Sequence, residues 1–131
     1  MGTFALVFMG CGAIILYQTT VDGLHPLGIP LVFGGIISVM IYALGHISGA
    51  HFNPAVTIAF AAARHFPLKK VFAYIPAQLL GAIVASLLHK WILGIENHQF
   101  GTTINNLAIL PGFILEVIFT FFLMLVIISV A

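Results

Sequence analysis

The residues best placed to do chemistry lie in the run Gly49-Ala50-His51-Phe52-Asn53-Pro54-Ala55. Asparagine is a favoured helix N-cap and proline is favoured at the first helical position, so a helix is predicted to begin at Asn53 and Pro54. The N-terminus of a helix presents free N–H groups and about half a unit of positive charge. Such an end attracts water oxygens or anions and repels cations, which indicates binding or conduction rather than catalysis.

The residues before this helix predict a second set of polar groups. We expect Gly49, Ala50, His51 and Phe52 to run as extended chain, with some of their carbonyl groups turned toward a cavity because no helix satisfies them. A row of acceptors that leads to a cluster of donors suits a file of water molecules. The alternative is a simple kink between two helices, which would not require two glycines and a histidine so close together.

The other polar or reactive side chains favour structural roles. His46 and His51 have no Cys, Asp or Glu nearby, so neither a metal site nor any other cofactor is predicted. Glu116 is the one acid inside a predicted membrane span, where a carboxylate costs roughly 2.5 to 3.5 kcal/mol. We expect it to accept hydrogen bonds and anchor a loop, with a proton-relay acid as the alternative. No nucleophile, base and orienting group converge, so an enzyme is not expected.

The composition places these residues in a membrane protein. Of the 131 residues, 62% are hydrophobic and only 5% are charged, and the mean hydropathy is +1.22. Soluble domains carry about 25% charged residues. The net charge of +1 comes from scattered residues, which excludes the basic patch that nucleic acid requires. We therefore expect the lipid bilayer, and not nucleic acid, to be the surrounding partner.

The hydropathy pattern predicts an all-α membrane protein with four transmembrane helices and one re-entrant segment. The helix that begins at Pro54 ends near Arg64 and is about 16 Å long at 1.5 Å per residue, which is half a bilayer. It therefore enters and leaves the membrane on the same side. The expected spans are residues 2–18, 29–44, 71–93 and 109–131, and the re-entrant loop with its half-helix covers residues 45–64.

The basic residues predict the orientation of these spans. Arg64, Lys69 and Lys70 are three of the four basic residues in the chain. The positive-inside bias therefore places the loop that holds them in the cytoplasm, and the N-terminus with it. Both ends of the chain lie inside apolar segments, so we expect a fragment or one half of a larger protein.

The run Ser-Gly-Ala-His-Phe-Asn-Pro-Ala-Val-Thr, from Ser48 to Thr57, resembles the first signature of the aquaporin, or major intrinsic protein, family. This signature is specific, and the resemblance covers the whole chain. Further similarities to the family's first, third and fourth spans lie at Gly2-Thr3-Phe4, Gly10-Cys11-Gly12, Ala77-Gln78, Gly81-Ala82, Glu116 and Thr120-Phe121. The resemblance implies the first half of an aquaporin-like inverted-repeat fold, whose complete form has six spans and two half-helices.

The resemblance also implies a passive water channel, present here as its N-terminal half. The resemblance implies that Asn53 donates from its side-chain amide to the passing solute, and that the carbonyls of Gly49, Ala50 and His51 accept from it. Phe33 lies twenty positions before Asn53 and matches the aromatic residue of the outer constriction, where phenylalanine accompanies water and tryptophan accompanies glycerol. The Asn-Pro-Ala motif is Asn53, Pro54 and Ala55, and the expected pore lining is Phe33, Ile37, Gly49, Ala50, His51, Phe52 and Asn53.

The sequence departs from the family pattern in its second half. It contains neither a second Asn-Pro-Ala, nor the constriction arginine that follows it, nor a fifth and sixth span. Glu116 resembles the residue that steadies the second pore loop, which this chain does not contain. The alternatives to a water channel are a facilitator for glycerol or another small neutral solute, and a non-conducting membrane subunit that needs a partner half. The resemblance suggests a homotetramer for the complete channel.

Overall fold

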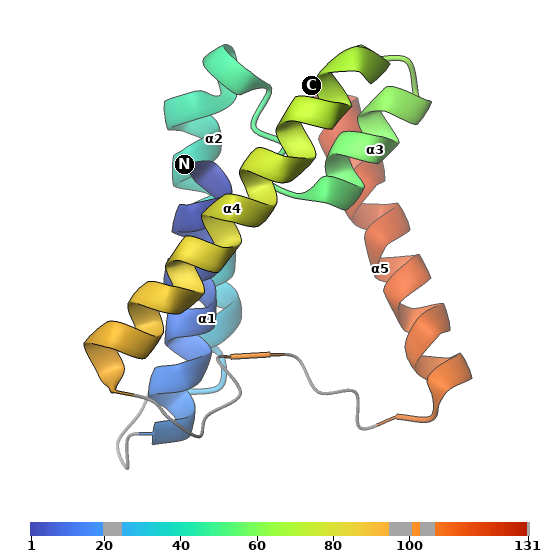
Figure 1. The fold of residues 1–131 in the computed structure, drawn as a ribbon. Coiled ribbons are helices and arrows are strands. Elements are labelled where there is room, and N and C mark those ends of the chain that lie inside the picture. Colours follow the sequence, from blue (N-terminus) through green and yellow to red (C-terminus); the bar gives the residue numbers. More distant parts are fainter. Residues whose placement is uncertain (20–24, 95–100, 103–106, 131) are drawn as a thin grey trace.

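The computed structural model describes residues 1–19, 25–94, 101–102 and 107–130 of the chain. Within these residues the chain forms α-helices and no strands (Figure 1). Four of the helices are long and apolar enough to cross a membrane, and the nine-residue α3 is not. The predicted all-α architecture is therefore confirmed. The helices are α1 (Gly2–Thr19), α2 (Gly28–Ser48), α3 (Pro54–Ala62), α4 (Leu68–Leu93) and α5 (Ile109–Val130).

The helix boundaries differ from the predicted spans by up to four residues, and the largest difference is at the end of the second helix. We expected the helix to stop at Leu44, but α2 continues through Gly45 and ends at Ser48. A single glycine inside a helix costs only about 1 kcal/mol, which neighbouring residues offset. The helix ends instead at Gly49, whose φ of 70° gives a left-handed cap and whose N–H donates to the Gly45 carbonyl at 2.8 Å. The last residue of the predicted fourth span, 131, lies outside the described residues.

α1, α2 and α4 pack together, and α3 connects α5 to them. α1 contacts both α2 and α4, whereas α3 contacts α4 and α5. Figure 1 shows α5 leaning away from α1, α2 and α4, so that it meets the rest of the molecule beside α3. The α3–α5 contact is a small apolar cluster in which Val56 and Phe60 meet Met124.

Small residues let α1 lie close to its neighbours. Gly81 on α4 faces the backbone of Phe4, whose nitrogen would lie 3.2 Å from a Cβ at that position. Gly10 faces the ring of Phe33 on α2 so closely that a Cβ there would overlap the ring. Small residues at helix contacts are typical of membrane bundles, in which close packing replaces the hydrophobic driving force.

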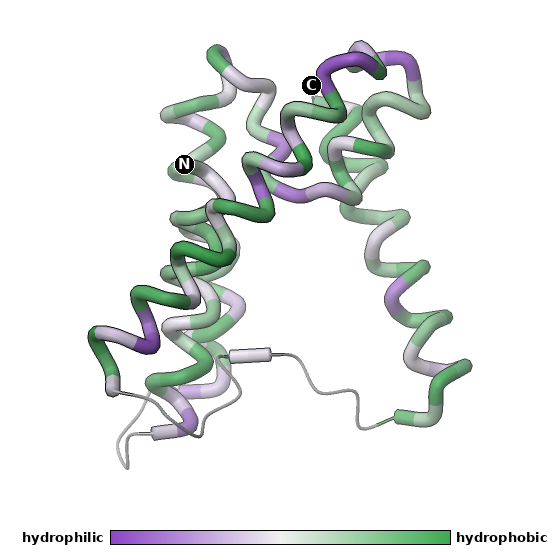
Figure 2. The backbone as a smooth tube through the Cα atoms, viewed as in Figure 1, coloured by the Kyte–Doolittle hydropathy of each residue, from purple (hydrophilic) through white to green (hydrophobic). Residues whose placement is uncertain are grey.

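The outer surface is apolar on nearly all sides. Figure 2 shows that hydrophobic residues predominate along α1, α2 and α4, and that α5 is hydrophobic over most of its length, with a hydrophilic stretch near its middle. Large side chains such as Tyr42, Phe72 and Phe119 are exposed on these surfaces. A helix that is hydrophobic all round belongs in lipid or in the core of a larger assembly.

Candidate functional site

Asn53 begins α3 as the sequence predicted. Its backbone is extended, with φ −143° and ψ 134°, and Pro54 occupies the first helical position. The side-chain Oδ1 accepts a hydrogen bond of 2.8 Å from the N–H of Ala55. Of the two polar atoms of this side-chain amide, only the oxygen can accept a hydrogen bond from an N–H group. The bond therefore fixes the orientation of the Asn53 amide. The Nδ2 group remains as a donor on an exposed side chain.

The segment before Asn53 differs from the extended chain that we predicted. Gly49, Ala50 and Phe52 have φ values of 70°, 51° and 50°, which is left-handed backbone. A positive φ is strained for residues other than glycine, and it costs of order 1–3 kcal/mol at each of Ala50 and Phe52. The surrounding contacts must therefore hold Ala50 and Phe52 in place.

Two hydrogen bonds and one packing contact tie the segment to α1 and α4. The hydroxyl of Thr3 donates to the Phe52 carbonyl at 2.9 Å, and the hydroxyl of Tyr74 donates to the Ser48 carbonyl at 3.1 Å. The buried ring of Phe52 packs where a Cβ on Gly2 would overlap it. Phe52 therefore anchors the segment to α1 with both its ring and its carbonyl. Its expected place in a pore lining stays a prediction.

The backbone of the preceding residues is left free. Among the residues that the structure describes, no hydrogen bond uses the carbonyl groups of Gly49, Ala50 or His51. These three carbonyls are acceptors, and the Asn53 amide that follows them is a donor. Three acceptors without a protein partner are thus followed by one donor along this short segment.

The buried side of the segment is organised around the hydroxyl of Thr57, which is 0% exposed. This hydroxyl donates to the Asn53 carbonyl at 3.0 Å, and the same carbonyl also accepts from the Thr57 N–H at 3.0 Å. The side-chain Nε2 of Gln78 on α4 lies 2.9 Å from the hydroxyl oxygen, and Nδ1 of His51 lies 3.2 Å from it. The bond from Gln78 to Thr57 is therefore a polar contact between α4 and α3.

The side chain of His51 lies in an aromatic cluster. Its ring stacks on Phe60 with a centroid distance of 4.6 Å and an interplanar angle of 7°. The ring of Phe66 makes a T-shaped contact with it at the same centroid distance. Tyr74 adds a third ring at 5.5 Å. The ring of His51 therefore packs against the half-helix. The acceptor that we expected from this residue is its backbone carbonyl.

Sequence reasoning missed the role of Thr57. The usable signal was its position four residues after Asn53, one helical turn along, where a hydroxyl reaches back to the carbonyl of the N-cap residue. Tyr74 was missed as well. Its spacing of four residues before Gln78 puts both on one face of α4, the face that meets the segment.

The two expected pore residues on α2 lie apart from this segment. Phe33 and Ile37 are half-buried, and the ring of Phe33 packs against Gly10 of α1. α2 makes no direct contact with α3, so the structure does not bring Phe33 and Asn53 together. Their shared function in a pore stays a prediction.

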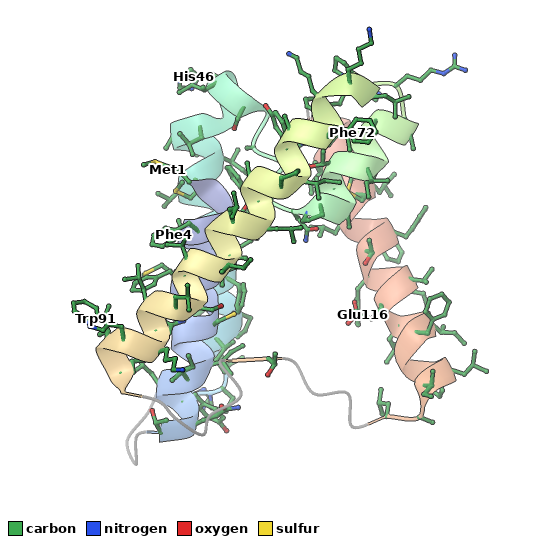
Figure 3. The ribbon with its side chains drawn as sticks, viewed as in Figure 1. Met1, Phe4, His46, Phe72, Trp91 and Glu116 are labelled. Atoms are coloured by element: carbon green, nitrogen blue, oxygen red, sulfur yellow. The ribbon has the colours of Figure 1, made fainter. Side chains whose placement is uncertain are left out.

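Glu116 lies exposed on α5, beside a shallow hollow of about 330 Å³ that Thr120 and Phe121 also line. In Figure 3 its side chain is on the side of α5 that faces the other long helices. Within the described part of the chain, Glu116 has neither a hydrogen-bond partner nor an ion-pair partner. The loop that it is expected to anchor is not present here, and this role stays a prediction.

Comparison with known proteins places the whole chain in one family. The model of the major intrinsic protein family matches residues 1–131. Nodulin-26 of Glycine max is 46% identical over 131 residues, which is 100% of this chain and 48% of that protein. Aquaporin NIP1-1 of Oryza sativa subsp. japonica is 45% identical over 130 residues, covering 99% of this chain and 46% of the relative.

A third relative has the same pattern. Aquaporin NIP3-1 of Arabidopsis thaliana is 42% identical over 139 residues, which is 100% of this chain and 43% of that protein. This chain thus spans about half the length of the curated relatives that it matches. The family match over every residue, together with the helix that begins at Asn53-Pro54-Ala55, shows that the chain belongs to the major intrinsic protein family.

Proposed function

We propose that this chain forms the N-terminal half of a passive channel for water. One observation carries the proposal: the Oδ1 atom of Asn53 is engaged by the N–H of Ala55, so that the Nδ2 donor is presented on an exposed side chain. The free carbonyls of Gly49, Ala50 and His51 supply acceptors just before it. A water molecule both donates and accepts hydrogen bonds, so it can bind to the carbonyl acceptors and then to the amide donor. The positive end of α3 disfavours cations.

The family supports transport of water or of another small neutral solute, and we favour water because Phe33 is the bulky residue at the expected constriction. The basic residues Arg64, Lys69 and Lys70 support a cytoplasmic N-terminus. Labelling of a His65→Cys variant in a Cys11→Ala background, from each side of the membrane, tests this orientation. The resemblance supports a homotetramer, which crosslinking in the membrane tests.

The test of conduction uses the chain fused to the part of soybean nodulin-26 that follows its matched region. We expect liposomes with this fusion to shrink under osmotic shock faster than empty liposomes, and liposomes with the chain alone to behave as empty ones. A folded fusion that conducts no water contradicts the proposal. Uptake of glycerol at a comparable rate favours the facilitator alternative, and a folded but silent fusion favours a non-conducting subunit.

The variant Asn53→Ser isolates the amide donor. Serine is as good an N-cap as asparagine, so α3 is expected to begin at the same residue. The fusion that carries Asn53→Ser loses the Nδ2 donor and is expected to conduct less water. Asn105→Ser changes an asparagine elsewhere in the chain and serves as the matched control, with water conduction that we expect to be unchanged.

A further inference from the structure

Tyr74 on α4 reaches the last residue of α2. Its hydroxyl donates to the carbonyl of Ser48 at 3.1 Å, although the two residues lie 26 positions apart in the chain. Among the described helices, α2 packs only against α1, so no helix packing between α2 and α4 supports this bond. The end of α2 is therefore joined to α4 through a long side chain rather than through a helix contact.

The ring of Tyr74 is held by two other aromatic rings. It makes a T-shaped contact with Phe66 at a centroid distance of 4.8 Å, and its centroid lies 5.5 Å from that of His51. Phe66 and His51 also contact each other, with centroids 4.6 Å apart. The hydroxyl oxygen lies on the axis about which a tyrosine ring flips, so a flip leaves the oxygen in place. Tyr74 therefore presents its hydroxyl from a fixed position.

The bond from Tyr74 fixes the peptide unit that joins Ser48 to Gly49. A peptide unit is planar, so its carbonyl and its N–H turn together. In this unit the Ser48 carbonyl accepts from Tyr74, and the Gly49 N–H donates to the Gly45 carbonyl at 2.8 Å. Gly49 has a φ of 70°, and glycine adopts many other backbone conformations at little steric cost. The two hydrogen bonds therefore select one orientation of a unit that the glycine would otherwise leave free to turn.

The fixed peptide unit stands at the start of the row of free acceptors. The carbonyls of residues 49–51 make no hydrogen bond with the described part of the chain. The carbonyls on either side of them do, because Ser48 accepts from Tyr74 and Phe52 accepts from Thr3 at 2.9 Å. α4 and α1 thus supply one hydroxyl each, and these two hydroxyls hold the two ends of the row. The bond from Tyr74 holds the end that is attached to α2.

We propose that Tyr74 is a positioning residue for conduction, because its hydroxyl sets the direction in which the row of acceptors leaves α2. This inference rests on the proposed function, since the free carbonyls of residues 49–51 serve water only in a channel. Tyr74 acts through the Ser48 carbonyl and not on the solute. Without the hydroxyl, the Ser48 carbonyl becomes a further free acceptor and the peptide unit before Gly49 can turn. The Gly49 carbonyl, which belongs to the next peptide unit, then has no fixed direction.

The variant Tyr74→Phe removes the hydroxyl and keeps the ring that packs against Phe66 and His51. In the nodulin-26 fusion, we expect it to lower the water permeability per folded channel several-fold. We also expect the water flux to depend more steeply on temperature, because water meets acceptors without a fixed direction. A purely structural role would change the amount of folded channel and not the temperature dependence of the flux through it. Tyr42→Phe, which alters a tyrosine that is 90% exposed on α2, should conduct as the parent fusion does.

The outcomes of this experiment separate the role of Tyr74 from the proposed function. A folded parent fusion that conducts no water overturns the proposed function and, with it, any role of Tyr74 in conduction. A conducting parent in which Tyr74→Phe changes neither the permeability per channel nor its temperature dependence overturns the role of Tyr74 alone.

Solid-state NMR of the isotope-labelled chain in lipid bilayers tests the hydrogen bond without any measurement of conduction. We expect the parent chain to show a cross-peak between the Cζ carbon of Tyr74 and the carbonyl carbon of Ser48. In Tyr74→Phe, the Ser48 carbonyl carbon should move to a lower chemical shift and the signals of Gly49 should move as well, whereas Tyr42→Phe should leave both in place. A missing cross-peak, or a Ser48 signal that Tyr74→Phe does not move, overturns the proposal. Because the cross-peak is measured in the parent chain, the proposal remains decidable if Tyr74→Phe does not fold.

Discussion

The side-chain nitrogen of Gln78 on α4 lies 2.9 Å from the hydroxyl oxygen of Thr57 on α3, and both side chains are buried. The same hydroxyl donates to the carbonyl of Asn53 at 3.0 Å. A residue on a transmembrane helix is thereby linked, through one oxygen atom, to the residue that begins the half-helix. This link holds the backbone of Asn53, and the N-cap bond from Ala55 holds its side-chain amide.

Replacement of Thr57 tests the link between these residues. Thr57→Val keeps the shape of the side chain but leaves Gln78 and His51 without their hydrogen-bond partner, and we expect it to lower the free energy of unfolding by about 1–3 kcal/mol. Thr57→Ser retains the hydroxyl and is the matched control, with a much smaller expected loss. Equilibrium unfolding in detergent micelles, followed by circular dichroism, measures both. Equal losses for Val and Ser would show that the hydroxyl contributes little.

Gly10 on α1 packs against the ring of Phe33 on α2. A methyl group on Gly10 overlaps the Phe33 ring, so Gly10→Ala is expected to destabilise the chain by about 1–3 kcal/mol through overpacking. Gly34→Ala is the control, since nothing lies within 4 Å of the added carbon there. In the double variant with Phe33→Leu, the smaller side chain should recover part of the loss. Additive effects in this double-mutant cycle would contradict the direct contact.

Phe33 is also expected to set the size of the solute that passes. In the nodulin-26 fusion, Phe33→Ala widens the expected constriction, so glycerol uptake should rise relative to water flux. Liposome swelling in glycerol and in an impermeant osmolyte gives the two rates. Phe113→Ala, which removes an exposed phenylalanine from α5, is the control. If Phe33→Ala excludes glycerol as well as the parent fusion does, Phe33 is not part of the filter.

We expect Glu116 to contribute to stability and to water conduction only when the second half of the channel is present. In this chain it is exposed and makes no hydrogen bond with the described residues, so Glu116→Gln should change the free energy of unfolding by less than about 0.5 kcal/mol. In the fusion, a carboxylate that anchors the second pore loop would be lost, and both stability and water conduction should fall. An unchanged fusion, measured by thermal unfolding and liposome shrinkage, contradicts the anchoring role.

The pattern of apolar residues predicted the helices because hydropathy and caps act locally. Asn53 and Pro54 start α3 through bonds to the next few residues, and these are visible in the sequence. The end of α2 was misplaced because Gly45 and Gly49 look alike in sequence. Gly49 differs from Gly45 in its left-handed backbone, which the fold around it imposes.

The contacts of the candidate site were less predictable because they join residues far apart in the chain. Nothing near Thr3 indicates that its hydroxyl reaches the carbonyl of Phe52. His89 is another such case. It is buried on α4, its ring stacks on Phe8 at 4.7 Å, and its Nε2 lies 2.8 Å from the Phe8 carbonyl. Periodicity shows which face of a helix is apolar but not which partner a lone polar residue on that face will find.

The contact between α3 and α5 turns the half-helix into a pivot. Among the described helices, α5 meets only α3, where Met124 packs with Val56 and Phe60. The helix from Met124 back to Ile109 is a rigid arm of about 22 Å at 1.5 Å per residue. A small tilt at Met124 is therefore amplified toward the far end, and it moves Glu116 on the way. The packing of α5 on α3 around Met124 thus bears on the position of a carboxylate two helical turns away.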